Sequence, residues 1–164
     1  MAHGQRLFRI DAAIERGGLF IPYVLSDGRS APWAYTIGLT EVGHPELVLY
    51  GADEESTARF LNWIGHRIVH HGERLPVGRQ ARELAGAPIR YLPVPAEVVR
   101  RTDVVLWAVD YYGSLRRSTG PVEALQCMWA DRHGLFPWQA GFDESDGSKW
   151  GAMPLLDEVR LDAA

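Results

Sequence analysis

The sequence predicts an α+β fold: a single domain with an antiparallel or mixed sheet built from hairpins and with helices packed on one face. Several short segments alternate apolar and polar residues with the period of a strand, and segment 53–71 repeats apolar residues with the period of a helix. A chain of 164 residues buries enough surface for one core, so we expect one domain over 1–164 with its core in 5–156. The polar segment 143–150 is expected to be a mobile loop, and 157–164 a tail.

Five segments carry a strand pattern. Between positions 32 and 40, aromatic or aliphatic residues alternate with small or polar ones, which predicts a strand with one buried face. A continuous apolar run predicts a fully buried strand at 46–51, and turn residues at 26–29 predict a hairpin between the first two strands. The predicted strands are 19–25, 32–40, 46–51, 88–94 and 121–130.

Segment 53–71 also has the start and stop signals of a helix. Asp53 is placed as the N-cap, two acidic residues follow in the first turn, and Gly72 follows the last turn. The predicted apolar face consists of Thr57, Phe60, Leu61, Ile64, Ile68 and His71. Further helices are predicted at 5–16 and 104–112, where β-branched residues leave a strand open as the alternative, and one helical turn is predicted at 82–85.

Composition argues against several classes of protein. Because phosphate contacts need clustered cations, the net charge of −4 and the pI near 5.8 argue against a nucleic-acid partner. No run approaches the roughly 20 apolar residues of a membrane span, so we expect no membrane association. A lone cysteine, Cys127, and the lack of an apolar leader predict a cytoplasmic protein. Lys149 is the one lysine among 17 basic residues, from which we infer a bacterial genome rich in GC.

A short loop between two predicted strands gathers three titratable side chains. Glu41, His44 and Glu46 lie within six residues, and Pro45 keeps the backbone of His44 out of the helical region. A histidine beside a carboxylate is the usual acid–base pair near pH 7. His44 and Glu41 are therefore the candidate catalytic residues.

We expect this loop to face segment 129–138 across a pocket for a small organic molecule. Such pockets combine apolar walls with a few polar groups. The candidate ligand-binding residues are Trp33, Tyr35, Glu46, Trp129, Asp131 and Trp138. In the competing, structural interpretation, the aromatic residues fill the core while His44 and Asp131 stabilise turns.

Neither a metal nor a cofactor is predicted. His66 and His70 lie four residues apart, a spacing that can chelate zinc, but Arg67 stands where the His-Glu-x-x-His motif has its glutamate. A solvated face is the favoured interpretation of this pair. His71 is expected to be partly buried and hydrogen-bonded, and Cys127 to be a packed thiol.

Four blocks of the sequence resemble a known family. They are Trp-Ala-Tyr-Thr-Ile-Gly-Leu-Thr-Glu at 33–41, Gly-His-Pro-Glu-Leu at 43–47, Gln-Cys-Met-Trp-Ala-Asp at 126–131 and Gly-Leu-Phe-Pro-Trp at 134–138. With these blocks the chain resembles the bacterial domain of unknown function 4262 over about residues 5 to 156. The resemblance implies a compact α+β domain and supplies no mechanism.

Two other functions stay open. Six tryptophans are many for this length, and tryptophan is enriched in interface hot spots, so a protein–protein interaction or regulatory module of the immunity or stress type is the main alternative. A weaker alternative, suggested by hairpins and aromatic residues, is a split barrel that binds flavin or haem. A homodimer is compatible with each function.

Overall fold

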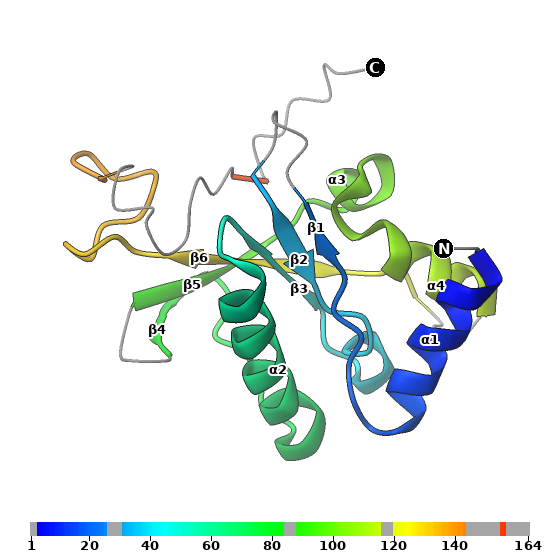
Figure 1. Cartoon of the computed structure of the whole chain (residues 1–164). Coiled ribbons are helices and arrows are strands. Elements are labelled where there is room, and N and C mark those ends of the chain that lie inside the picture. The colour runs from blue at the N-terminus through cyan, green and yellow to red at the C-terminus, as the bar shows by residue number, and fades with distance from the viewer. Residues whose placement is uncertain (1–2, 26–30, 84–87, 116–119, 144–154, 157–164) are drawn as a thin grey trace.

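A computed structural model describes residues 3–25, 31–83, 88–115, 120–143 and 155–156 (Figure 1). The predicted turn at 26–29, the tail at 157–164 and all but the first residue of the loop predicted at 143–150 lie outside the described residues. No described helix is both long enough and apolar enough to cross a membrane.

The described strands form one open, mixed sheet of six strands in the order β1-β2-β3-β6-β5-β4. Their bounds are β1 Tyr23–Val24, β2 Trp33–Tyr35, β3 Glu46–Tyr50, β4 Gln80–Arg82, β5 Pro88–Pro93 and β6 Ala124–Trp129. The central pair β3 and β6 runs parallel, and the other neighbours run antiparallel. The predicted α+β class is confirmed, but the described sheet does not close, so the split-barrel alternative loses its architectural basis.

Each predicted strand contains an observed one, and all five observed strands are shorter than predicted. The predicted antiparallel pairing of the first two strands is confirmed in β1 and β2, β2 also pairs antiparallel with β3, and all five residues of β3 are buried as expected. Strand β4 was not predicted, and it lies where a helical turn was expected to begin, at Arg82. A three-residue exposed strand at the sheet edge has little apolar alternation to reveal it.

Within the described residues, four α-helices accompany the sheet: α1 His3–Glu15, α2 Glu54–His71, α3 Ala96–Arg101 and α4 Leu106–Leu115. The Asp53 carboxylate accepts a hydrogen bond from the Ser56 backbone N–H, and Gly72 ends α2 with φ of 66°, as the sequence predicts. Before α4, the Thr102 hydroxyl accepts from the Val104 backbone N–H and starts a 3₁₀ turn, Asp103–Val105. This region is therefore helical, and the strand alternative is wrong.

Helices cover both faces of the sheet rather than one (Figure 1). Successive residues of β3 point to opposite faces, so Leu47 and Leu49 pack with α2 whereas Val48 and Tyr50 pack with α1, α3 and α4. The predicted apolar face of α2 is confirmed except at its end, where His71 is exposed. The last turn of α2 extends beyond the sheet core, so a residue there can lie on the apolar face of the helix and still be exposed.

Candidate functional site

The Glu46 carboxylate lies at the start of β3 and is fully buried. Six donors surround it: the hydroxyls of Thr36 (2.7 Å), Thr40 (2.8 Å) and Tyr112 (3.1 Å), and the backbone N–H groups of Gly38 (3.2 Å), Leu39 (3.3 Å) and Thr40 (3.0 Å). Burial raises the pKa of Glu46 above its ordinary value, and the hydrogen bonds from Thr36, Thr40 and Gly38 act in the opposite direction. Since a carboxylate offers about four lone-pair positions, Glu46 has none left for substrate.

This arrangement explains the residue types in the 36–40 turn. The hydroxyl of Thr36 donates to Glu46 and accepts from the Leu47 backbone N–H, so it ties β3 to the turn. Gly38 has φ of 134°, and a Cβ there would lie 2.8 Å from the Leu19 side chain. The conspicuous sequence block around Gly38 therefore builds a cradle for a buried carboxylate, and Glu46 is a structural residue.

His44 is buried as well, with 4 % of its surface exposed. Its Nδ1 lies 2.7 Å from the Pro45 carbonyl oxygen, which fixes Nδ1 as the donor. Burial and the nearby Arg74 guanidinium lower the pKa of His44, although the bond to Pro45 opposes this shift. Glu41 is exposed, and within the described chain no hydrogen bond joins it to His44. The predicted acid–base pair is therefore not assembled in this structure.

Trp33 and Tyr35 hold the helical layer onto the sheet. The Trp33 indole N–H donates to the Val104 carbonyl oxygen at 3.1 Å, and its ring stacks on Tyr50 with centroids 5.5 Å apart. The buried Tyr35 hydroxyl accepts from the Trp107 backbone N–H at 3.0 Å. Both side chains are thus occupied in packing at the start of α4.

The remaining predicted site residues lie at the other end of the sheet. Glu46 is in register with Ala124 in the parallel strand β6, so Trp129 lies five residues further along. At about 3.3 Å per residue this separation is about 17 Å. This structure therefore does not bring the 41–46 loop and segment 129–138 together across a pocket. The reason is the parallel pairing of β6 with β3, which the sequence does not reveal.

At that far end, the three predicted residues have different surroundings. Trp129 is buried edge-on against Phe60, on the α2 face. Burial alone would raise the pKa of Asp131, but backbone N–H groups of Asp143, Leu135 and His133 donate to its carboxylate and hold the pKa below its ordinary value. Asp131 thus closes a turn, and Trp138 is left 39 % exposed.

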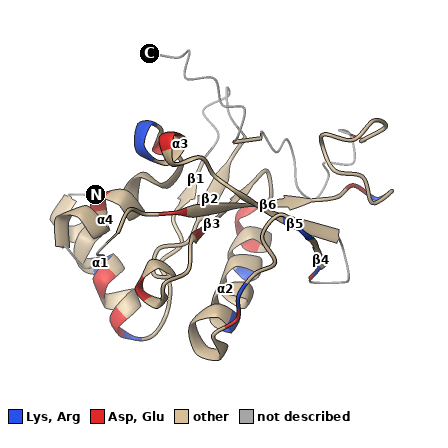
Figure 2. Cartoon of the chain, turned by 180° about the vertical axis from the view of Figure 1, so that it is seen from behind, with Lys and Arg blue, Asp and Glu red and all other residues tan. Residues whose placement is uncertain are grey.

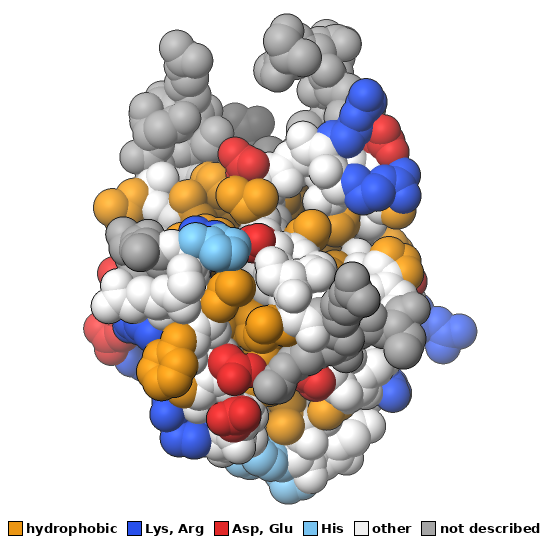
Figure 3. All heavy atoms as spheres, turned by 90° about the vertical axis from the view of Figure 1, so that its right-hand side faces the viewer, with side chains coloured by type: hydrophobic (Ala, Val, Ile, Leu, Met, Phe, Trp, Pro, Cys, Tyr) orange, Lys and Arg blue, Asp and Glu red, His pale blue; other side chains and the backbone are white. Residues whose placement is uncertain are grey.

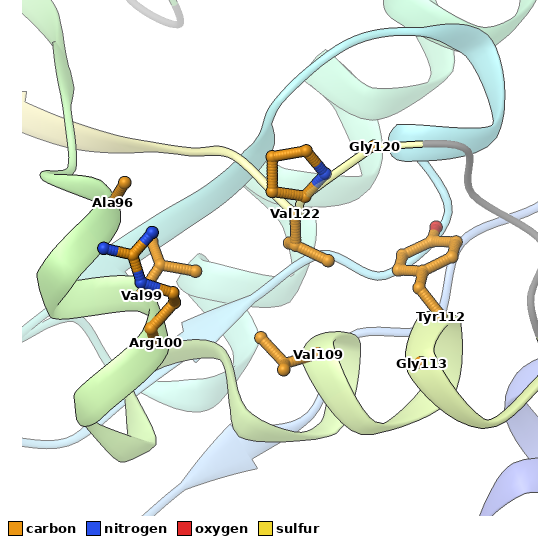
Figure 4. A pocket seen from close by; sticks show the side chains of 9 residues that line it. Ala96, Val99, Arg100, Val109, Tyr112, Gly113, Gly120 and Val122 are labelled. Carbon is orange, nitrogen blue, oxygen red and sulfur yellow. The ribbon is translucent and has the colours of Figure 1, made fainter.

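A pocket of about 530 Å³ opens elsewhere, between α3, α4 and the chain leading into β6. In Figure 4, Val109 of α4 and Val122 point toward one another across it, and Tyr112 forms one end. The lining residues are Ala96, Val99, Arg100, Val109, Tyr112, Gly113, Gly120, Pro121 and Val122. The walls are mainly aliphatic, and the Tyr112 hydroxyl is turned to Glu46, so the pocket borders the cradle without opening it.

None of the predicted site residues lines this pocket. Seven of its nine lining residues are valine, alanine, proline or glycine, which carry no chemical signature in a sequence. One signal was present: α4 is apolar on nearly every side, and its exposed residues include Leu106 and Val109. An apolar outer face on a surface helix indicates a surface that binds a ligand or packs against another molecule. The face that carries α1 and α4 shows hydrophobic side chains between charged ones (Figure 3).

The described residues include no group of three or more histidine, cysteine or acidic side chains placed to hold a metal ion. The rings of His66 and His70 lie 4.4 Å apart on an exposed face of α2. Cys127 is buried, and burial raises the pKa of its thiol, so the thiolate is disfavoured.

A family model described as "Domain of unknown function (DUF4262)" matches residues 13–143. No curated protein and no solved structure matches the chain.

Proposed function

Because the chain belongs to the DUF4262 family, whose description names no activity, we propose from geometry alone that the protein binds a small aliphatic organic acid in the pocket between α3 and α4. The observation that carries this proposal is the pocket itself. Its volume of about 530 Å³ lies within the range of about 300–1,000 Å³ that is typical of small-molecule sites.

The walls suit an aliphatic chain. Val99, Val109 and Val122 come from three separate segments and supply branched, apolar surface. Tyr112 adds an aromatic ring whose polar atom is already bonded to Glu46, so the ring offers a ligand mainly its apolar part. An apolar ligand would bury this surface at a gain of about 25 cal/mol per Å².

One charged side chain lies at the rim. The Arg100 guanidinium donates to the Glu97 carboxylate at 2.6 Å and is otherwise well exposed. A guanidinium has five N–H donors, so Arg100 can bind a ligand carboxylate while it keeps its contact with Glu97. This favours an acid over a neutral hydrocarbon.

Binding is better supported than catalysis. The two titratable side chains in the lining are Arg100 and Tyr112. Burial, followed by the neighbouring Glu46 carboxylate, raises the pKa of Tyr112, so this phenol stays protonated near neutrality and cannot accept a proton as a base. No nucleophile–base pair is available in this lining.

Decanoate is a suitable probe, and calorimetric titration is the test. At about 0.4 kcal/mol per non-hydrogen atom, its dissociation constant is expected near 0.3 mM. Gly113→Leu should abolish saturable binding, because a Cβ at Gly113 meets no atom within 4 Å and the side chain would enter the pocket. Ser114→Leu adds the same side chain to an exposed position outside the lining and should leave binding unchanged.

The charged rim is tested by a second pair of variants. Arg100→Gln should weaken decanoate binding about threefold, the effect expected of an exposed ion pair. Arg101→Gln is the control, because Arg101 contacts the same Glu97 but does not line the pocket. Equal binding by wild type and Gly113→Leu would contradict the proposed site.

The aromatic argument for a protein–protein module has less support. Of the described tryptophans only Trp138 is exposed, whereas Trp33, Trp63, Trp107 and Trp129 are partly or fully buried. A homodimer stays a prediction, which light scattering would test. Cytoplasmic location and origin in a GC-rich bacterium also remain proposals, which rest on cysteine and lysine usage.

A further inference from the structure

Arg90 carries a charge that nothing in the described chain neutralises. Its neighbours in β5, Ile89 and Tyr91, belong to the core under α2, so Arg90 points to the opposite face of the sheet. Its Nε is buried and has no hydrogen-bond acceptor, and the guanidinium makes no ion pair with any described residue. By contrast, nearby Arg132 pairs with Asp143 at 2.7 Å. Figure 2 shows basic residues on β4 and β5 at this end of the molecule.

Two stacked aromatic rings accompany the guanidinium. Phe136 and Trp138 are nearly parallel, at 5° with centroids 5.0 Å apart. The Arg90 Cζ lies 5.2 Å from the Phe136 centroid and 5.8 Å from that of Trp138. These three residues form what we call the Arg90 cluster. Since Trp138 remains 39 % exposed with Phe136 against it, ring surface is left for a planar ligand.

The loop that presents the aromatic rings is held in place. The Asp131 carboxylate accepts from the backbone N–H groups of Leu135 and Asp143, and the Gln139 side-chain oxygen accepts from the Phe136 N–H at 2.8 Å. Phe136 itself is buried. The cluster is therefore preorganised, which lowers the entropy that binding must overcome.

We propose that the Arg90 cluster is a second binding site, which takes a planar aromatic carboxylate. The guanidinium fork matches a carboxylate with two parallel hydrogen bonds, and an aromatic ring on that carboxylate stacks on Trp138. The Arg90 cluster is separate from the pocket between α3 and α4, because none of the three cluster residues lines that pocket.

The test is calorimetric titration with 2-naphthoate. Wild type should bind one equivalent, and both Arg90→Gln and Arg90→Lys should bind about tenfold more weakly, because lysine keeps the charge but lacks the fork. Trp138→Ala alters an exposed residue and should weaken binding about fivefold. Melting curves identify any variant that fails to fold. If the Arg90 variants do not fold, Trp138→Ala still tests the site.

Arg82→Gln is the matched control, since Arg82 is an exposed arginine on the neighbouring strand β4. It should change the affinity less than twofold, and Gly113→Leu should not change it. Equal weakening by Arg82→Gln would overturn the proposal in favour of a general cationic surface. Loss of binding in Gly113→Leu would place naphthoate in the other pocket. The proposal would also be contradicted if 2-naphthoate did not bind saturably, or if an equal concentration of inorganic phosphate displaced it.

Discussion

The cradle around Glu46 and the pocket between α3 and α4 share Tyr112, but the hydrogen-bonding groups of the cradle are satisfied within the protein whereas the pocket leaves its walls open to a ligand. In the cradle, six donors converge on one carboxylate and leave it no free acceptor position. In the pocket, aliphatic walls are left uncovered and Arg100 lies at the rim. The residues whose chemistry stands out in the sequence thus stabilise the fold, while inconspicuous residues form the open surface.

The largest expected effect is on the cradle. Glu46→Gln should lower the free energy of unfolding by about 4 kcal/mol, because an amide N–H₂ would face fixed backbone donors such as the Leu39 N–H. Denaturant titration measures this change. Glu41→Gln alters an exposed carboxylate in the same loop and should stay within about 0.5 kcal/mol of wild type. Equal stability of both variants would remove the structural role of Glu46.

A smaller effect should separate the two regions at Tyr112. Tyr112→Phe removes the hydrogen bond to Glu46 but keeps the ring in the pocket. It should cost about 2 kcal/mol of stability, as expected for a buried hydrogen bond to a charged group, and leave the affinity for decanoate within twofold. Unchanged stability with lost binding would mean that the hydroxyl serves the ligand rather than the cradle.

His44 should show its role in the dependence of stability on pH. In the unfolded chain His44 takes up a proton near pH 6.5, but in the folded protein it does so only at lower pH. The unfolded state therefore binds more protons between these values, and the stability of wild type should fall as pH decreases from about 6.5. His44→Gln should cost about 1 kcal/mol at pH 8 and lack this contribution at lower pH. Parallel curves for the two proteins from pH 8 to 5 would contradict a buried neutral imidazole.

The smallest effect is expected within the pocket. Gly113 lies in α4 with open space beside it, so Gly113→Ala should raise the free energy of unfolding by about 0.5–1 kcal/mol through helix propensity. Ser114→Ala is a matched substitution on the same helix, without the loss of a glycine. A destabilised Gly113→Ala protein would mean that the pocket wall does not tolerate even a methyl group.

Most of the fold was predictable because its signals are local. The cap at Asp53, the stop at Gly72 and the buried run of β3 each depend on a few neighbouring residues. Helix α3 was not predicted, since it is six residues long and follows two prolines that suggested an extended chain. The layer opposite α2 also went unpredicted. The continuous apolar run of β3 implies cover on both faces, but no local signal in the sequence says which face of the sheet a given helix covers.

The candidate site was harder to predict because it depends on how distant segments meet. Parallel pairing of β3 with β6 puts the loop at His44 and the turn at Asp131 at opposite ends of the sheet. These two segments, each of which carries plausible site residues, are therefore not neighbours in space. Trp138 is the predicted ligand-binding residue that remains exposed, and its partner Arg90 could not be chosen among 17 basic residues from sequence alone.

The most direct measurement is a two-dimensional ¹H–¹⁵N NMR titration of the full chain with decanoate. If the pocket binds and the cradle is structural, the largest shifts should fall on the amides of α3, of α4 around Val109, and of Val122. The amides of the 41–46 loop and of the turn at Asp131 should move little. Shifts that are largest at His44 and Glu46, with the α3 and α4 amides unchanged, would contradict the assignment of the binding site to this pocket.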